Sequence, residues 1–316
     1  MVEEEDYDTN RFLSKLAQDS FYEDLEKKFL AERYITYDRA AYPLLYDQIE
    51  ARGWNALLQR PVRDTFPGEI AREFYANAHF SKATEVAWVR GVEVRFTPDA
   101  INEFYNIEWP VGQKDETDDL FRRGEIEDEH LAQMKGFLSV DNQDTYEPLR
   151  QGQLTREAKA WAVVMCSHFA PTSFNTHYGN TRVPLLYALT KGLKFNLGKV
   201  IYARIRNTID RTSTKQKSFI FPYLIFGLCK NAGVDFGVMQ EVCKLGTPIG
   251  NQSICATLGL TYQNYAPRPN PPAGNYAPRP NPPAGRVQRV PREIERRLDA
   301  LERKFTIHSE YTSTLI

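Results

Sequence analysis

A directly repeated, proline-rich segment limits how much of this 316-residue chain can belong to one folded body. Residues 264–274 read NYAPRPNPPAG, and residues 275–285 repeat the same letters. Four prolines in eleven residues exclude the interior of a helix or a sheet, because proline lacks an amide proton and has a fixed φ. The repeat is typical of an extended, semi-rigid spacer of polyproline character. We therefore expect a folded body before it and a separate segment after it.

The composition of the whole chain is typical of a folded protein. It contains 40 Lys and Arg against 41 Asp and Glu, and 42% of its residues are hydrophobic. This balance argues against a uniformly basic nucleic-acid coat and against a wholly disordered acidic chain. A body of this length buries enough apolar surface to fold without disulfides.

Capping residues and apolar spacing predict helices along most of the body. Residues 20–23 (SFYE) match a capping box, which predicts a helix that starts there. Residues 155–169 carry apolar residues three or four apart, so we expect a buried helix that begins at Thr155 and is ended by Pro171. The apolar run at residues 219–229 (FIFPYLIFGLC) is too short to cross a bilayer, and it predicts another buried helix.

One segment departs from the helical period. Residues 85–96 carry β-branched and aromatic residues on both sides of Arg90 and Gly91, a pair typical of a tight turn. They predict a short β-hairpin. The next residues, Thr97 and Pro98, are typical of a helix start, because threonine caps the first amides and proline needs no partner for its nitrogen.

The predicted fold class is therefore mainly α, a compact helical domain with one short hairpin. The expected organisation is an acidic disordered tail (1–18), the helical domain (19–250), a proline-rich linker (251–290), an amphipathic helix (291–309) and a tail (310–316).

The stretch after the repeat has the apolar spacing of a short coiled coil. Its candidate seam residues alternate four and three apart: Ile294, Leu298, Leu301 and Phe305. About two heptads are present, and an isolated helix of this length is marginal in water. We therefore expect the seam to associate with a second copy or to pack back on the body.

No targeting segment or membrane anchor is expected. The chain begins MVEEEDYDTN, whereas secretory signals begin with positive charge and transit peptides are poor in acids. We expect an intracellular protein, nuclear or cytoplasmic, that is not secreted and does not contact membranes.

Charge is distributed unevenly along the body. Residues 108–130 hold nine acids and three bases, whereas residues 191–230 hold nine bases and one acid. A local positive excess binds phosphates by releasing counterions even where the whole chain is neutral. The alternative is that these charges face solvent or pair with the acidic segment. The candidate nucleic-acid-binding residues are Lys191, Lys194, Lys199, Arg204, Arg206, Arg211, Lys215 and Lys217.

Common motifs for catalysis are absent from the sequence. It contains no P-loop, nucleophile elbow or zincin motif, and its four cysteines form no C-x-x-C pair. Cys166 and His168, with His177 nearby, would suit a metal site or a Cys/His nucleophile pair. The apolar residues before Cys166 favour core packing instead. We predict no catalytic residue, metal, cofactor or small-molecule ligand.

Four segments carry a family resemblance: residues 74–77 (FYAN), 89–102 (VRGVEVRFTPDAIN), 154–173 (LTREAKAWAVVMCSHFAPTS) and 221–234 (FPYLIFGLCKNAGV). Together they resemble the "putative plant transposon protein" domain over roughly residues 30–250. The resemblance implies a protein that originates from a plant mobile element. It carries no catalytic motif onto particular residues of this chain.

Three functions are open on the sequence alone. The first is a non-enzymatic, transposon-derived protein that assembles through its C-terminal helix and contacts nucleic acid through residues 191–230. The second is a metal-dependent transposase or nuclease whose carboxylates converge only in the fold. The third is a protein-interaction adaptor with no role in nucleic-acid binding. Function depends on the site and not on the fold, so the site has to decide between them.

Overall fold

The computed structural model describes residues 7–36, 39, 42–55, 65–81, 85–118, 126–172, 176–210, 218–237 and 241–259. The chain divides into two units, residues 1–266 and 267–316, and every described residue lies in the first. The second copy of the repeat and the seam residues Ile294, Leu298, Leu301 and Phe305 lie outside the described residues, as does the first copy.

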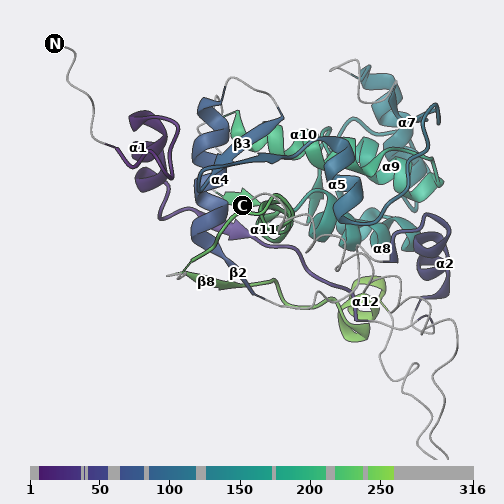
Figure 1. Cartoon of the computed structure of the whole chain (residues 1–316). Coiled ribbons are helices and arrows are strands. Elements are labelled where there is room, and N and C mark those ends of the chain that lie inside the picture. Colours follow the sequence, from purple (N-terminus) through teal and green to yellow (C-terminus); the bar gives the residue numbers. More distant parts are fainter. Residues whose placement is uncertain are drawn as a thin grey trace, which may run out of the picture. The chain divides into compact units, whose positions relative to one another are not determined.

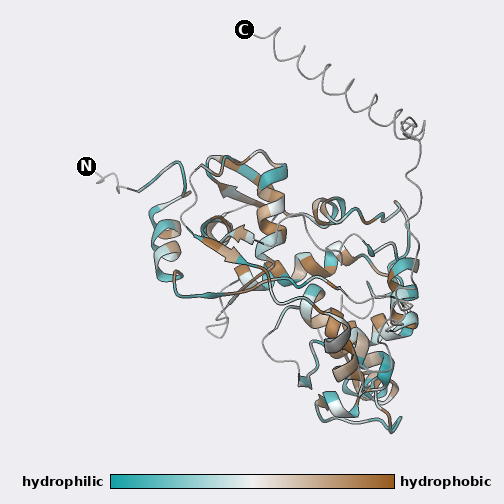
Figure 2. Ribbon diagram, turned by 90° about the horizontal axis from the view of Figure 1, so that it is seen from below, coloured by the Kyte–Doolittle hydropathy of each residue, from teal (hydrophilic) through white to brown (hydrophobic). Residues whose placement is uncertain are grey.

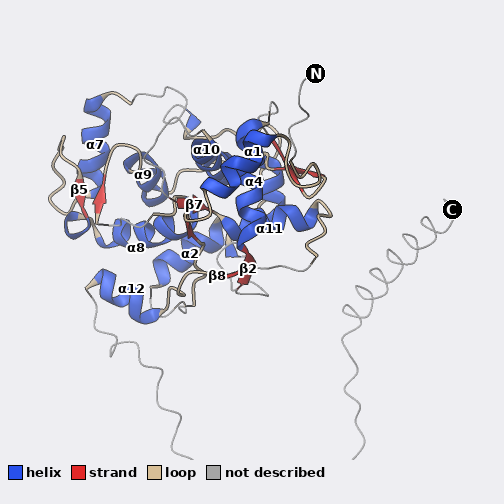
Figure 3. Ribbon diagram, turned by 90° about the vertical axis from the view of Figure 1, so that its left-hand side faces the viewer, coloured by secondary structure: helices blue, strands red, loops and turns tan. Residues whose placement is uncertain are grey.

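Helices dominate the described part of the chain (Figure 3). The α-helices are α1 (Lys15–Glu23), α2 (Pro43–Ala51), α4 (Gly68–Phe80), α5 (Pro98–Phe104), α7 (Asp128–Leu138), α8 (Arg156–Val164), α9 (Val183–Lys191), α10 (Leu197–Ile209), α11 (Pro222–Asn231) and α12 (Asn251–Leu258). A 3-10 helix (Gln151–Gln153) precedes α8, and a π-helix (Met165–Phe169) follows it. The prediction of a mainly α protein is confirmed.

The described strands are short and pair two by two. β1 (Lys28–Leu30) runs parallel to β7 (Ser218–Ile220). The antiparallel pairs are β2 (Thr65–Pro67) with β8 (Val242–Lys244), β3 (Val86–Val89) with β4 (Val92–Arg95), and β5 (Leu149–Arg150) with β6 (His177–Tyr178). Two of these pairs, β1 with β7 and β2 with β8, join the N-terminal part of the body to its C-terminal part.

The predicted hairpin and two predicted helix starts are confirmed. β3 and β4 pair with Val89 opposite Val92, and both turn residues have positive φ, 48° at Arg90 and 80° at Gly91. Thr97 accepts a hydrogen bond from the amide of Ala100 at the start of α5. The equivalent cap at the start of α8 is Thr155.

The N-terminal expectations need correction. α1 begins at Lys15 with Ser14 as its cap, so the helix start predicted at residues 20–23 is wrong. Ser20 is instead buried inside α1, and Phe12 is only 2% exposed. Residues 7–18 therefore pack on the body, beside α4 in Figure 1, and do not form a free tail over their whole length.

Two further boundaries differ from the sequence expectation. The apolar run at residues 219–229 is not one helix, because residues 218–220 form β7 and α11 starts only at Pro222. Phe221 lies between them with a φ of +50°. Beyond residue 250, α12 packs on α8 with Ile254 buried, so the body includes residues that we expected in the linker.

The core is rich in aromatic side chains. Trp54 packs edge-on against Trp161, Phe169 and Phe195, and Tyr75 stacks on Phe219 with ring centroids 4.6 Å apart. Hydrophobic and hydrophilic residues alternate along the helices in Figure 2, as expected for amphipathic helices around a core. Among the described helices, none combines the length and the apolar character that crossing a membrane requires.

Gly198→Ala is expected to lower the free energy of unfolding by about 1–3 kcal/mol. Gly198 lies where α10 crosses α5, and an added Cβ would clash with the carbonyl oxygen of Pro98 and lie 2.7 Å from Oδ1 of Asn102. Helix propensity alone would favour alanine by about 1 kcal/mol, so the sign of the effect is informative. Chemical denaturation measures it.

The control is Gly152→Ala, because an added Cβ there meets nothing within 4 Å. We expect it to change stability by less than about 0.5 kcal/mol. A Gly198→Ala protein as stable as the wild type would contradict the close approach of α5 and α10.

Candidate nucleic-acid interface

The described candidate bases lie on α9, on the loop after it and on α10. Gly192, with a φ of +79°, ends α9. Asn196 caps the start of α10, because its side chain accepts a hydrogen bond from the amide of Lys199. Ile201 and Ile205 face the core. Lys191, Lys194 and Lys199 are exposed, and Arg204 and Arg206 are half-buried. Arg211, Lys215 and Lys217 lie outside the described residues.

Lys199 is neutralised by the acidic segment. Its Nζ lies 3.4 Å from Oδ1 of Asp118 and 3.9 Å from Oδ2 of Asp115. Glu116 lies alongside, because its carboxylate accepts the amide of Lys194 at 2.6 Å. The alternative that the basic and acidic segments pair therefore holds for Lys199.

The other four described bases keep their positive charge without a carboxylate partner. Within the described part of the chain, no carboxylate oxygen lies within 4.0 Å of the charged side-chain nitrogens of Lys191, Lys194, Arg204 or Arg206. Lys191 donates to Oη of Tyr187 at 2.6 Å, and Arg204 donates to the carbonyl of Thr181 at 3.0 Å. These contacts orient two of the bases without cancelling their charge.

Arg204 lies near a second arginine, Arg182. Burial lowers the pKa of Arg204, the nearby charge of Arg182 lowers it further, and Cys166 raises it. Arg182 in turn donates to Oγ1 of Thr172 at 2.8 Å. Arg182 precedes the basic segment along the chain, so the charge pattern of the sequence did not indicate it.

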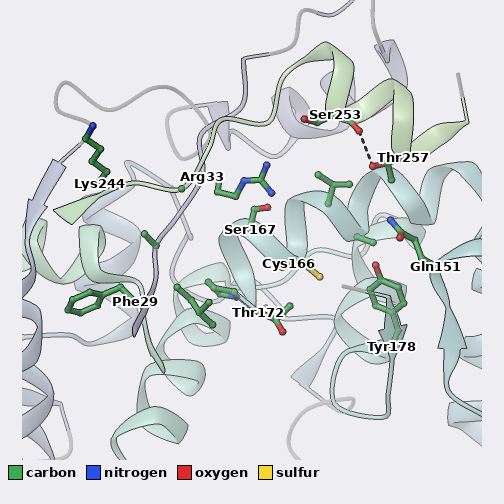
Figure 4. Close-up of a pocket in the computed structure, with 16 residues that line it drawn as sticks. Phe29, Arg33, Gln151, Cys166, Ser167, Thr172, Tyr178, Lys244, Ser253 and Thr257 are labelled. Carbon is green, nitrogen blue, oxygen red and sulfur yellow. Dashed lines mark hydrogen bonds between the residues drawn. The ribbon is translucent and has the colours of Figure 1, made fainter. Parts of the chain in front are cut away.

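Thr172 and Cys166 also line a pocket of about 360 Å³, drawn in Figure 4. The pocket lies between the segment after β1, the π-helix and α12. Arg33 enters it from the segment after β1, and Ser167 enters it from the π-helix. The described lining includes two bases, Arg33 and Lys244, and no Asp or Glu. The pocket is therefore electropositive.

The cysteine and histidines singled out in the sequence do not form a nucleophile pair. Burial raises the pKa of Cys166 to about 11, so its thiol is neutral near pH 7 and is a weak nucleophile. Burial also lowers the pKa of His168 to about 3. His177 is exposed, and its Nδ1 lies 3.0 Å from Oγ1 of Thr176. No hydrogen bond joins Cys166 to either histidine among the described residues.

The carboxylates buried in the described structure have partners in the protein. Glu73 binds Arg11 and Arg90, and Glu32 accepts the amides of Tyr223 and Leu224. Across the described ranges, no group of three or more His, Cys, Asp or Glu side chains is placed to hold a metal ion.

Sequence reasoning did not find the residues of the pocket as a site. The run Cys166-Ser167-His168 was the local signal, but it drew attention to the thiol and the imidazole and not to the hydroxyl. Arg33 gave no signal, because its position depends on contacts with residues 246–249.

Comparison with known proteins gives one match. A family model described as "Putative plant retrotransposon-related domain" matches residues 50–235. That range contains α9, α10 and all eight candidate bases. No curated protein and no solved structure matches the chain.

Proposed function

Because the chain belongs to the putative plant retrotransposon-related domain family, we propose that it is a transposon-derived protein that binds the phosphate backbone of nucleic acid without cleaving it. The proposed interface consists of the bases of α9, α10 and the loop between them. Its described members are Lys191, Lys194, Arg204 and Arg206.

The observation that carries this proposal is the absence of carboxylate partners for these four bases within the described residues. A base already paired with a carboxylate must break that pair to bind a phosphate. An unpaired base releases only the counterions of the nucleic acid, which makes binding favourable and strongly dependent on salt. Lys199 belongs to the first class, so we do not include it in the interface.

Neutralising two members, the exposed Lys194 and the half-buried Arg206, should reduce the salt dependence of binding. A plot of the log of the binding constant against log salt concentration has a negative slope. For Lys194→Gln with Arg206→Gln, we expect this slope to become shallower by about 1.8 on duplex DNA and by about 1.4 on a single strand. Fluorescence anisotropy of a labelled oligonucleotide over a series of KCl concentrations measures the slope.

The matched control is Lys28→Gln with Arg95→Gln, which removes two exposed bases from β1 and β4. Neither base has a carboxylate within 4.0 Å among the described residues. The control should keep the wild-type slope. An identical slope for both double variants would refute the interface, and cleavage of the oligonucleotide by wild-type protein with Mg²⁺ or Mn²⁺ would refute a purely binding function.

A further inference from the structure

The position of Arg33 in the pocket is set by backbone pairing. Residues 32–36 run alongside residues 246–249, with hydrogen bonds from the amide of Gly246 to the carbonyl of Glu32 (3.1 Å) and from that of Ile249 to the carbonyl of Tyr34 (2.9 Å). Successive side chains of an extended segment point to opposite sides. Glu32 accordingly points into the core, and Arg33 points into the pocket (Figure 4).

Two neighbours hold the Arg33 side chain in place. Its Nε donates to the carbonyl of Thr247 at 2.6 Å. Gly246 leaves room for the stem, because a Cβ at that position would lie 2.5 Å from Cγ of Arg33. The terminal guanidinium nitrogens have no hydrogen bond and no ion pair with the described residues. The half-buried Arg33 guanidinium is thus held in one orientation toward the pocket, and its two terminal nitrogens are available to donate hydrogen bonds to a ligand.

Ser167 supplies a second polar group. It is 5% exposed, lines the pocket, and its hydroxyl has no hydrogen-bond partner within the described residues. Figure 4 shows the Ser167 hydroxyl and the Arg33 side chain both directed into the pocket. Ser167 belongs to the π-helix, a form that occurs frequently at functional sites.

The rest of the lining adds donors and no negative charge. Gln151 and Ser253 border the pocket with neutral polar side chains, and Lys244 stands at its margin. Tyr178 and Cys166 line the side below α12. A pocket whose described lining has an arginine fork, several neutral donors and no carboxylate favours an anion with several oxygens.

We propose that this pocket binds a phosphomonoester group. A phosphomonoester carries two negative charges and three terminal oxygens, which match the Arg33 fork and the Ser167 hydroxyl better than a single carboxylate does. A volume of about 360 Å³ lies at the lower end of the range for small-molecule sites and leaves room for the esterified group. This site shares no residue with the proposed interface on α9 and α10, and it does not depend on nucleic-acid binding.

Isothermal titration of the full chain with inorganic phosphate tests the site. We expect saturable binding that weakens at least about tenfold in Arg33→Gln and about fivefold in Ser167→Ala. Arg33→Lys should restore only part of the affinity, because a lysine keeps the charge and loses the fork. Lys28→Gln should bind phosphate as the wild type does.

The source of the phosphomonoester is distinguished in the same assay. Tighter binding of a mononucleotide than of phosphate would indicate a small-molecule ligand, and tighter binding of a 5′-phosphorylated than of a 5′-hydroxyl oligonucleotide would indicate a strand end. Both outcomes support the proposal.

Two outcomes would overturn it. One is no saturable phosphate binding by the wild type, and the other is undiminished binding by Ser167→Ala and Arg33→Gln. Circular dichroism checks that each variant is folded, and Ser167→Ala remains decisive if Arg33→Gln does not fold. The Lys194 and Arg206 variants should bind phosphate normally, so failure here and failure of the proposed function are distinguishable.

Discussion

Glu73→Ala should lower the free energy of unfolding by about 3–5 kcal/mol, a large fraction of the stability of a typical domain. Glu73 lies on α4 and is fully buried. Its carboxylate accepts a hydrogen bond from Nε of Arg11 (2.9 Å). It also accepts hydrogen bonds from the backbone amide (2.7 Å) and Nε (3.1 Å) of Arg90. It therefore joins the N-terminal segment and the hairpin turn to one helix.

The cost arises from the groups left behind. Burial raises the pKa of Glu73, and hydrogen bonds and charge from Arg11 and Arg90 oppose that rise. Removing the carboxylate leaves the partly buried guanidiniums of Arg11 and Arg90 with less negative charge beside them. Removing one partner of a buried ion pair is strongly destabilising. The backbone amide of Arg90 also loses its acceptor, in a turn that already has positive φ.

Glu69→Ala is the matched control for this prediction. Glu69 is one turn away on α4 and contacts the same two arginines, at 2.8 Å from Arg11 and 3.4 Å from Arg90. It is more exposed than Glu73, so we expect a loss of about 1 kcal/mol. Urea denaturation compares the two variants. Equal losses, or a larger loss for Glu69→Ala, would show that Glu73 does not organise this cluster.

Glu32→Gln should change how stability depends on pH. Glu32 is 7% exposed, and its two carboxylate oxygens accept the amides of Tyr223 (3.2 Å) and Leu224 (2.9 Å) at the start of α11. Burial raises its pKa from 4.5 to about 7, although these hydrogen bonds favour the charged form.

The sign follows from proton binding. Between pH 4.5 and about 7 the folded protein keeps a proton on Glu32 that the unfolded chain has lost, so rising pH favours unfolding. As the pH rises over that range, Glu32 should therefore lower the free energy of unfolding of the wild type by about 3 kcal/mol. Above pH 7 it should cause no further loss. Glutamine does not titrate, so the stability of Glu32→Gln relative to wild type should increase by that amount.

Comparing the two proteins at each pH removes the contributions of all other groups. Glutamine loses one acceptor for the amides of α11, but that cost is the same at every pH. Glu26→Gln, at an exposed position after α1, serves as the control. If the difference between Glu32→Gln and wild type were constant from pH 4.5 to 8, Glu32 would not be the buried acid described above.

Much of the fold was predictable where the decisive contacts are local. The caps at Thr97 and Thr155 bond amides three residues away, and the turn at Arg90 and Gly91 joins adjacent strands. The errors occurred where partners are distant. Phe219, in the apolar run that predicted a helix, pairs instead with Phe29 across β1 and β7. No periodicity within either segment encodes that pairing.

The helical character, the hairpin and the basic segment could be read from the chain alone, because each depends on the order of residues within a short stretch. The three-dimensional fold settles which charges matter. It paired Lys199 with Asp118, left Arg206 without a carboxylate among the described residues, and brought Arg33 to Ser167 across more than a hundred residues of chain. The physical reason is that charge, burial and hydrogen-bond satisfaction are set by neighbours in space, and long-range backbone pairing chooses those neighbours.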